Sequence, residues 1–215
     1  MQPDFIFIIL ILILSVVIHE VSHGYAAEML GDPTARLQGR LTLNPLKHLD
    51  PLGSVIIPAL LVLSKAGFLI GWAKPVPYNP YNLRNARWGE AIVAGAGPLT
   101  NIFIALVFGF LIRFGVLYGF LTPAFVSIAS YVVFINILLA MFNLLPVPPL
   151  DGSKVLRSVL PYRLAYRYDS FIMFFSRYGM LASLIFIFVF VSILWQPFSL
   201  FVSYLFRILT GLPLF

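Results

Sequence analysis

The sequence predicts an all-α polytopic membrane protein with about five transmembrane helices, a short membrane-associated β-strand or hairpin, and a re-entrant segment. Two observations predict this class. Of the 215 residues, 60% are hydrophobic and only 10% are charged, whereas soluble domains average roughly 45–50% apolar and roughly 25% charged residues. Several apolar runs are long enough to cross the ~30 Å hydrocarbon layer as helices of about 20 residues. We expect the whole chain, residues 1–215, to form a single integral membrane domain.

The predicted transmembrane helices are four long apolar runs and one shorter run. They are Phe5–Leu30, Ala91–Leu117, Ala124–Leu145, Gly179–Trp195 and the shorter Phe198–Phe215. No Lys or Arg precedes the first run and no small-residue cleavage site follows it, so we expect it to remain as a helix in the mature protein. Most Lys and Arg residues lie between the first and second long runs or between the third and fourth. The positive-inside rule therefore predicts that these two connections are cytoplasmic.

Two segments between the first two spans have different patterns. In Leu37–Leu43, small or apolar residues alternate with polar ones, and this period of two indicates a strand. The unpaired edge of such a strand is a template for an extended peptide. The apolar run Ser54–Ile70 is interrupted by Pro58, Lys65 and Gly67, and a full crossing would put the basic cluster after it on the outside. We therefore interpret it as a re-entrant or interfacial segment beside a cavity.

Charge and cysteine content exclude some classes of partner. The net charge of +6 does not indicate nucleic-acid binding, because the basic residues flank apolar spans, where they orient helices and contact anionic lipid. The lipid bilayer is the expected partner. The chain has no cysteine, so any bound metal must use histidine and carboxylate ligands.

The first span contains the sequence His19-Glu20-Val21-Ser22-His23. Four residues make just over one helical turn, so both imidazoles project from one face and can share a metal, with Glu20 beside them to take a proton from metal-bound water. Ionisable residues inside a span are costly and usually functional, although a satisfied polar cluster between helices is the alternative. The 14 residues Phe5–Ile18 supply about 21 Å of helix before the first ligand. We therefore expect the metal within the bilayer, nearer the cytoplasmic side.

A catalytic zinc needs a third protein ligand and one open position. Asp151 differs from the other acidic residues because the segment Asn143–Gly152 interrupts a long apolar helix with three prolines and then presents a carboxylate. Proline removes backbone donors and prevents regular helix, so this segment can bend a carboxylate inward at membrane depth. The alternative is that Asp151 only caps a helix that begins near Ser153.

Three blocks together resemble the site-2 protease family of intramembrane zinc metalloproteases, peptidase family M50. They are His19–His23, Ala96–Asn101 and Asn143–Gly152, in the order of the family. Asn44–Gly53 and Gly71–Pro77 are similar to the compact bacterial and archaeal subgroup that lacks a PDZ domain. Family members commonly have a transmembrane helix before the histidine motif, and this chain begins almost directly with that motif's helix, which leaves the route of the substrate open.

The resemblance implies one Zn²⁺ per chain and regulated proteolysis within or near the transmembrane segments of membrane-protein substrates. It implies a prokaryotic plasma membrane with the active site toward the cytoplasm. Carried over position by position, the metal ligands are His19, His23 and Asp151, and Glu20 is the general acid/base.

The resemblance also implies roles for two asparagines. Asn101 is expected near the site and Asn143 beside the unwound segment, where a side-chain amide can bind substrate backbone or stabilise an oxyanion. The alternative is that both asparagines form hydrogen bonds between helices and have no other role.

His48 and the overall activity leave alternatives open. His48 lies in a turn-rich segment after the predicted strand, where a surface or capping role is favoured over metal binding. Substrate contact at the cytoplasmic mouth of the site is the sharper hypothesis. A metal or ion transporter is the alternative function, because intramembrane His and Asp can mark a cation path, although no repeated halves are evident. A catalytically inactive adaptor is a third alternative. The sequence predicts no particular oligomeric state.

Overall fold

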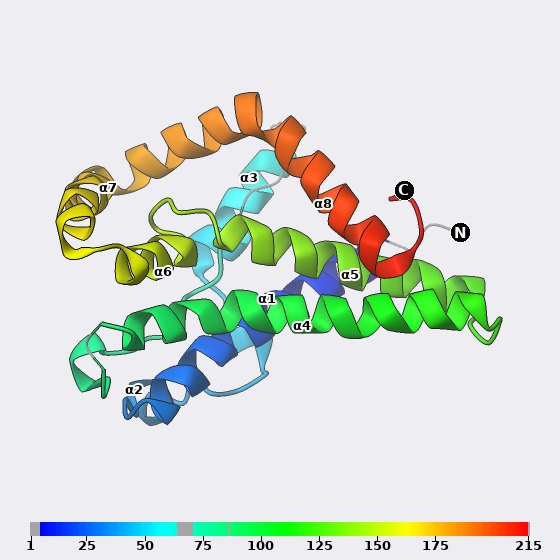
Figure 1. Cartoon of the computed structure of the whole chain (residues 1–215), viewed down its shortest axis with the longest axis horizontal. Helices are drawn as coiled ribbons and strands as arrows, with labels where there is room; N and C mark the ends of the chain where they lie inside the picture. The colour runs from blue at the N-terminus through cyan, green and yellow to red at the C-terminus, as the bar shows by residue number, and fades with distance from the viewer. Residues whose placement is uncertain (1–4, 64–70, 86, 215) are drawn as a thin grey trace.

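The computed structural model describes residues 5–63, 71–85 and 87–214 (Figure 1). Within these ranges the regular structure is helical and no β-strand occurs. The α-helices are α1 (Phe5–Met29), α2 (Thr34–Leu37), α3 (Ile57–Leu63), α4 (Gly89–Leu117), α5 (Pro123–Asn143), α6 (Asp151–Val159), α7 (Tyr162–Val189) and α8 (Trp195–Thr210). Short 3₁₀ or π turns are η1 (Pro45–Lys47), η2 (Pro51–Ile56), η3 (Pro80–Asn82) and η4 (Phe190–Leu194).

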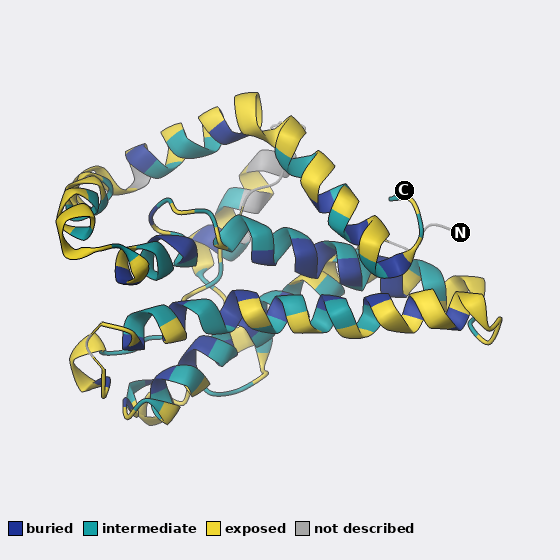
Figure 2. Ribbon diagram, viewed as in Figure 1, coloured by how far each residue is buried: buried dark blue, intermediate teal, exposed yellow. Residues whose placement is uncertain are grey.

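Helices α1, α4 and α5 lie side by side along the length of the molecule, and α8 packs against α4 and α5 (Figure 1). Small residues allow these close approaches, as is common between membrane helices. A Cβ added at Gly109 of α4 would lie 2.8 Å from the Cβ of Leu209. The apolar core that α4, α5 and α8 share contains Ala105, Ile112, Ala129, Val133, Ile137, Val202 and Phe206. Many large apolar residues around it are exposed, as expected of a surface that faces lipid; Figure 2 marks exposed positions along the helices in yellow.

Four helical stretches are long and apolar enough to span a membrane, judged by length and composition. They are Phe5–Met29, Gly89–Leu117, Pro123–Asn143 and Leu181–Thr210. The prediction of an all-α integral membrane protein is therefore confirmed, but the predicted count of about five spans is not supported in the described residues. The two C-terminal apolar runs form one helical stretch that bends at η4 (Figure 1). Pro197 removes one helical hydrogen bond, and the chain accommodates it with the π turn η4 instead of ending the helix.

Parts of both connections rich in basic residues, among them α2, α6 and the beginning of α7, lie at one end of the bundle, whereas α3 extends away from that end (Figure 1). The short turn between α4 and α5 lies at the opposite end. The prediction that these basic segments face the cytoplasm stays a prediction.

The predicted strand Leu37–Leu43 is wrong. Leu37 ends α2, and the following residues form a turn and irregular backbone. Gly39 has a φ of 62°, which reverses the chain where an extended strand would continue. The side chain of Arg40 is turned inward and only 7% exposed whereas Gln38 is exposed, so the polar residues of the alternating pattern do not share one solvent-facing side.

The predicted re-entrant segment Ser54–Ile70 is described in its first part, where η2 leads into α3, while residues 64–70 lie outside the described ranges. The residues that precede and follow this segment are hydrogen-bonded to one another. Trp72 donates its backbone N–H to the carbonyl of Gly53 at 3.2 Å, and Lys74 donates to the carbonyl of His48 at 2.8 Å. The chain thus returns to the point at which the segment begins, which supports the re-entrant interpretation. The depth of the segment in the membrane stays a prediction.

Candidate metal centre

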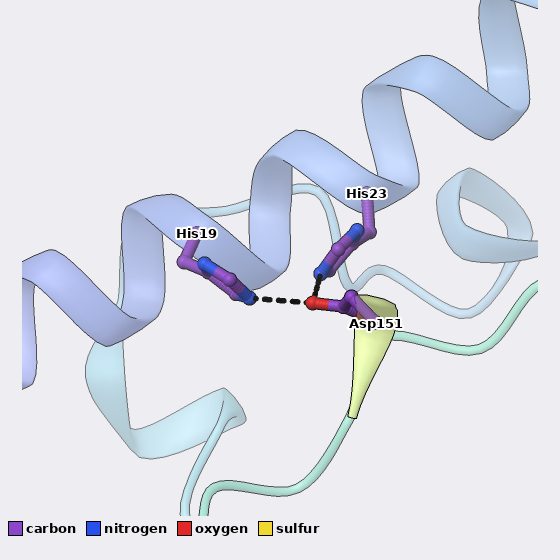
Figure 3. Close-up of side chains that lie close together, drawn as sticks. All are labelled: His19, His23 and Asp151. Atoms are coloured by element: carbon purple, nitrogen blue, oxygen red, sulfur yellow. Dashed lines mark hydrogen bonds and ion pairs between the residues drawn. The ribbon is translucent and has the colours of Figure 1, made fainter. Parts of the chain in front are cut away.

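Three candidate ligands converge from two distant parts of the chain (Figure 3). His19 and His23 project from one face of α1, and Asp151 is the first residue of α6. Asp151 Oδ2 lies 3.2 Å from His19 Nε2 and 3.3 Å from His23 Nε2. Their donor atoms all lie within 4.8 Å of one another. The two histidines are buried, so the cluster is enclosed between helices.

The proline-rich segment after α5 turns the Asp151 carboxylate toward the histidines. The N-cap of α6 is Leu150, and no side chain caps this end, so a capping role for Asp151 finds no support. Ser153 Oγ instead donates to the carbonyl of Leu150 at 2.7 Å. A Cβ at Gly152 would lie 2.1 Å from the backbone oxygen of Leu144. Glycine is therefore required for α6 to start against the end of α5.

Hydrogen bonds to both Nδ1 atoms orient the imidazoles. His19 Nδ1 lies 2.5 Å from Asn101 Oδ1, and His23 Nδ1 lies 2.7 Å from the carbonyl oxygen of Val93. Because these partners are oxygen acceptors, each Nδ1 carries the proton and each Nε2 presents its lone pair to the cluster. This is the tautomer that a metal ligand needs.

A buried polar network continues behind His19. Asn101 Nδ2 donates to Asn136 Oδ1 at 2.7 Å, and Asn136 Nδ2 donates to Ser15 Oγ at 2.9 Å. Both asparagines are 0% exposed. Sequence reasoning placed Asn101 near the site but missed Asn136 and Ser15. The signal that could have found them is a polar side chain in the middle of an apolar span.

Gly97 of α4 lies directly against the two histidines. A Cβ at this position would be 2.6 Å from His19 Nε2 and 2.6 Å from His23 Nε2. The backbone of α4 therefore covers the ligand face of α1 at a distance that only glycine allows.

Glu20 lies beside the cluster but is not one of its three converging donors. Its Oε2 accepts a hydrogen bond from the backbone N–H of Val76 at 2.9 Å. The segment Gly71–Asn79 that carries Val76 has no regular secondary structure.

Asn143 and His48 do not join the cluster. Asn143 Nδ2 donates to the carbonyl of Leu139 on its own helix at 3.0 Å. His48 is 2% exposed, and its Nε2 lies 2.8 Å from the carbonyl oxygen of Thr42. A surface role for His48 is thus excluded, whereas the substrate roles of both residues stay predictions, and each would require breaking the bond described.

Electrostatics at the start of α6 favour charged side chains. Burial alone would raise the pKa of Asp151, but positive charge on the adjacent imidazoles of His19 and His23, when these are protonated, outweighs burial and holds the pKa of Asp151 well below its usual range. One turn later, burial would lower the pKa of Lys154, but its interactions with Tyr78, Asp151 and Glu90 raise it overall. Lys154 Nζ lies 5.1 Å from the centre of the Tyr78 ring. Asp151 is therefore ionised, and a cation lies nearby.

The donor set fits zinc. Two neutral imidazoles and one carboxylate, within reach of one another and fixed by outer hydrogen bonds, are the protein ligands typical of a catalytic zinc with an open fourth position.

Comparisons with known proteins agree with this chemistry. The sequence model of peptidase family M50 matches residues 121–186, which include α5, the proline-rich segment and Asp151. The provisionally named zinc metalloprotease YwhC of Bacillus subtilis (strain 168) is 41% identical over 160 residues, covering 72% of this chain and 69% of YwhC. The chain belongs to peptidase family M50.

Other relatives are less similar or match a shorter stretch. Rip2 of Mycolicibacterium smegmatis, also provisionally named a zinc metalloprotease, is 33% identical over 155 residues, covering 71% of this chain and 56% of Rip2. The similarly named MJ0611 of Methanocaldococcus jannaschii is 45% identical over 69 residues, covering 30% of this chain and 32% of MJ0611. The chain thus spans little more than half the length of Rip2. No solved structure matches it significantly.

Proposed function

We propose that this M50 protein is a zinc metallopeptidase that hydrolyses peptide bonds within or near the transmembrane segments of membrane-protein substrates, as a step of regulated intramembrane proteolysis. The observation that carries the proposal is that Asp151 of α6 converges on His19 and His23, which lie beside Glu20 on a helix of membrane-spanning length. The names of the relatives as zinc metalloproteases add support.

In the proposed mechanism His19, His23 and Asp151 hold one zinc ion. When bound, zinc lowers the pKa of a coordinated water to about 7 and polarises the scissile carbonyl. Glu20 accepts the water proton at its carboxylate and delivers it to the leaving nitrogen. Asn101 and the carbonyl of Val93 keep the two imidazoles in the tautomer that leaves each Nε2 free to bind.

The substrate must present an extended backbone. A helix in lipid bonds all its amides internally, so cleavage requires local unwinding, and helix-weakening residues in the substrate lower that cost. We infer a prokaryotic plasma membrane with the site toward the cytoplasm. The bacterial and archaeal relatives support this membrane, and the basic connections at one end of the bundle support this orientation.

Metal transport remains the competing function but has less support. The outer hydrogen bonds of His19 and His23 and the close approach of Gly97 hold the ligands rigidly, which suits a resident metal better than a passing one.

The test is cleavage of tagged single-span segments that are coexpressed with the protein. Wild type is expected to cut at least one segment, and Glu20→Gln is expected to keep its zinc while losing about 10²–10⁴-fold in rate, the usual contribution of a general base. Equal cleavage by both proteins contradicts the role of Glu20. Full zinc stoichiometry in Asp151→Ala contradicts the ligand set.

A further inference from the structure

The segment Gly71–Asn79 is held along its length although it has no regular secondary structure. Beyond the two backbone bonds that join it to Gly53 and His48, Asn79 donates its N–H to Asp32 Oδ2 at 2.6 Å. Asp32 is 0% exposed. Both ends of the segment are therefore anchored to other parts of the fold.

The middle of this segment presents a single backbone donor. Pro75 and Pro77 have no N–H, so Val76 carries the only amide hydrogen of the tripeptide, and it donates to Glu20 Oε2 at 2.9 Å. Proline also restricts the residue before it to extended conformations, so Val76 has little freedom to turn its N–H elsewhere. The donor is preorganised toward the carboxylate.

Arg40 holds the other side of the same peptide group. Its Nη2 donates to the carbonyl oxygens of Lys74 at 2.8 Å and of Pro75 at 3.2 Å. The Pro75 carbonyl and the Val76 N–H belong to one planar peptide unit, so fixing the oxygen fixes the direction of the hydrogen. A positive charge on the oxygen also polarises the unit and strengthens its N–H as a donor.

The burial of Arg40 is difficult to explain by stability alone. Its side chain is 7% exposed, and among the described residues its recorded partners are carbonyl oxygens instead of a carboxylate. Burying a cation without a counter-ion is costly. The acidic group at the far side of the bridged peptide is Glu20, so the order is guanidinium, peptide group, carboxylate.

The Val76 side chain seats the segment on α1 one turn beyond Glu20. Val76 is 5% exposed, and a Cβ on Gly24 would lie 2.8 Å from Val76 Cγ1 and 2.5 Å from Leu41 Cδ2. The absence of a side chain at Gly24 thus lets the segment approach α1 closely enough for the hydrogen bond to Glu20.

We propose that Arg40 and the Pro75–Val76 peptide group are positioning elements that hold one oxygen of the Glu20 carboxylate and so fix the direction of the other. The inference rests on the proposed function, in which Glu20 is the general base. In this role Arg40 and Val76 act only through Glu20 and not on the three metal ligands.

Two substitutions at Val76 separate the N–H from the side chain. Val76→Pro removes the donor and keeps a ring of similar bulk in an extended segment, whereas Val76→Ala keeps the donor and removes the packing. We expect Val76→Pro to lower kcat about tenfold or more, a part of the contribution of a general base, with KM and zinc stoichiometry unchanged. Val76→Ala is expected to lose less of its kcat than Val76→Pro, because the N–H that bonds Glu20 remains although the packing that seats the segment is weakened.

Arg40 provides a second, independent test if Val76→Pro does not fold. Arg40→Met is expected to lower kcat with zinc still bound, and Arg40→Lys to restore part of it, because one ammonium replaces the guanidinium on the bridged carbonyls less completely. In the Glu20→Gln background neither Val76→Pro nor Arg40→Met should reduce the residual rate further, because the group that they position is absent.

Each outcome separates this inference from the proposed function. If Glu20→Gln abolishes cleavage but Val76→Pro and Arg40→Met cleave like wild type, the inference is wrong and the proposed function stands. A higher kcat in Val76→Pro would identify the contact as inhibitory and overturn the positioning role. If Val76→Ala lost as much kcat as Val76→Pro, the segment would act through packing alone, and the positioning role would be wrong. If wild type cleaved none of the tagged single-span substrates, the proposed function itself would be wrong.

Discussion

Replacing Asn136 tests how far the metal centre extends behind its ligands. Asn136 accepts from Asn101 Nδ2 at 2.7 Å and donates to Ser15 Oγ and the Val132 carbonyl, each at 2.9 Å. In Asn136→Ala, Asn101 Nδ2 retains only a 3.4 Å contact with the carbonyl of Ser15. The amide that holds His19 Nδ1 then loses the partner that fixes its orientation.

The expected loss follows from the place of Asn136 in the network. Removing a group that bonds a ligand directly typically costs 10–100-fold in metal affinity. Asn136 acts one bond further out, so we expect about tenfold, or about 1.4 kcal/mol, for Asn136→Ala and a larger loss for Asn101→Ala. Two of the three bonds of Asn136 join it to other helices, and the third lies within α5. Hydrogen bonds between membrane helices average about 0.6 kcal/mol, so we expect the variant to remain folded.

The assay is a zinc competition titration on purified protein in detergent. Asn143→Ala is the matched control, since it is the same substitution on the same helix and, within the described residues, the recorded side-chain bond of Asn143 is to the carbonyl of Leu139 on that helix. We expect its zinc affinity to equal that of wild type. Wild-type affinity in Asn136→Ala, or the same loss in Asn143→Ala, would refute the role of the network.

Three further predictions concern glycine contacts and a buried carboxylate. Gly97→Ala should abolish zinc binding, because the added Cβ would collide with the Nε2 atoms of His19 and His23. Gly95→Ala is the control and should bind zinc normally, since its Cβ would meet only Leu99 Cδ1 at 3.9 Å. The zinc stoichiometry of the two variants tests this prediction. Gly152→Ala should fail to accumulate or should lose zinc, because its Cβ would collide with the end of α5, and wild-type levels of both would contradict the packing. Burial alone would raise the pKa of Asp32, but its hydrogen bonds with Thr34, Asn79 and Asn82 lower the pKa overall. The stability that the ionised Asp32 adds is therefore present above pH about 4 and is lost as the pH falls further. Thermal unfolding in detergent between pH about 6 and about 3 should show this loss in wild type and a weaker one in Asp32→Asn.

The sequence predicted the features that local pattern determines. Helical spacing alone puts His19 and His23 on one face, and apolar length marks α1, α4 and α5 as spans. The third ligand needed the proline-broken segment before Asp151, together with a family resemblance. The structure brings these predicted ligands together, although their roles as ligands await experiment.

The features that were missed depend on contacts between distant segments. Arg40 lies in an alternating pattern typical of a strand, and only the position of Lys74 and Pro75 explains why it turns inward. Asn136 is one polar residue in an apolar helix, and its partner Asn101 comes from another helix. The bend at η4 also depends on how the chain accommodates Pro197, which a hydropathy pattern cannot distinguish from a helix end.

The most direct test of the central claim is to find where a substrate is cut. Wild type and Glu20→Gln would each be reconstituted in proteoliposomes with a single-span segment that the coexpression assay identifies, and the products measured by mass spectrometry. We predict new termini inside or at the edge of the apolar stretch, produced by wild type and absent with Glu20→Gln. Cuts confined to the soluble flanks, or the same products from both proteins, would contradict it.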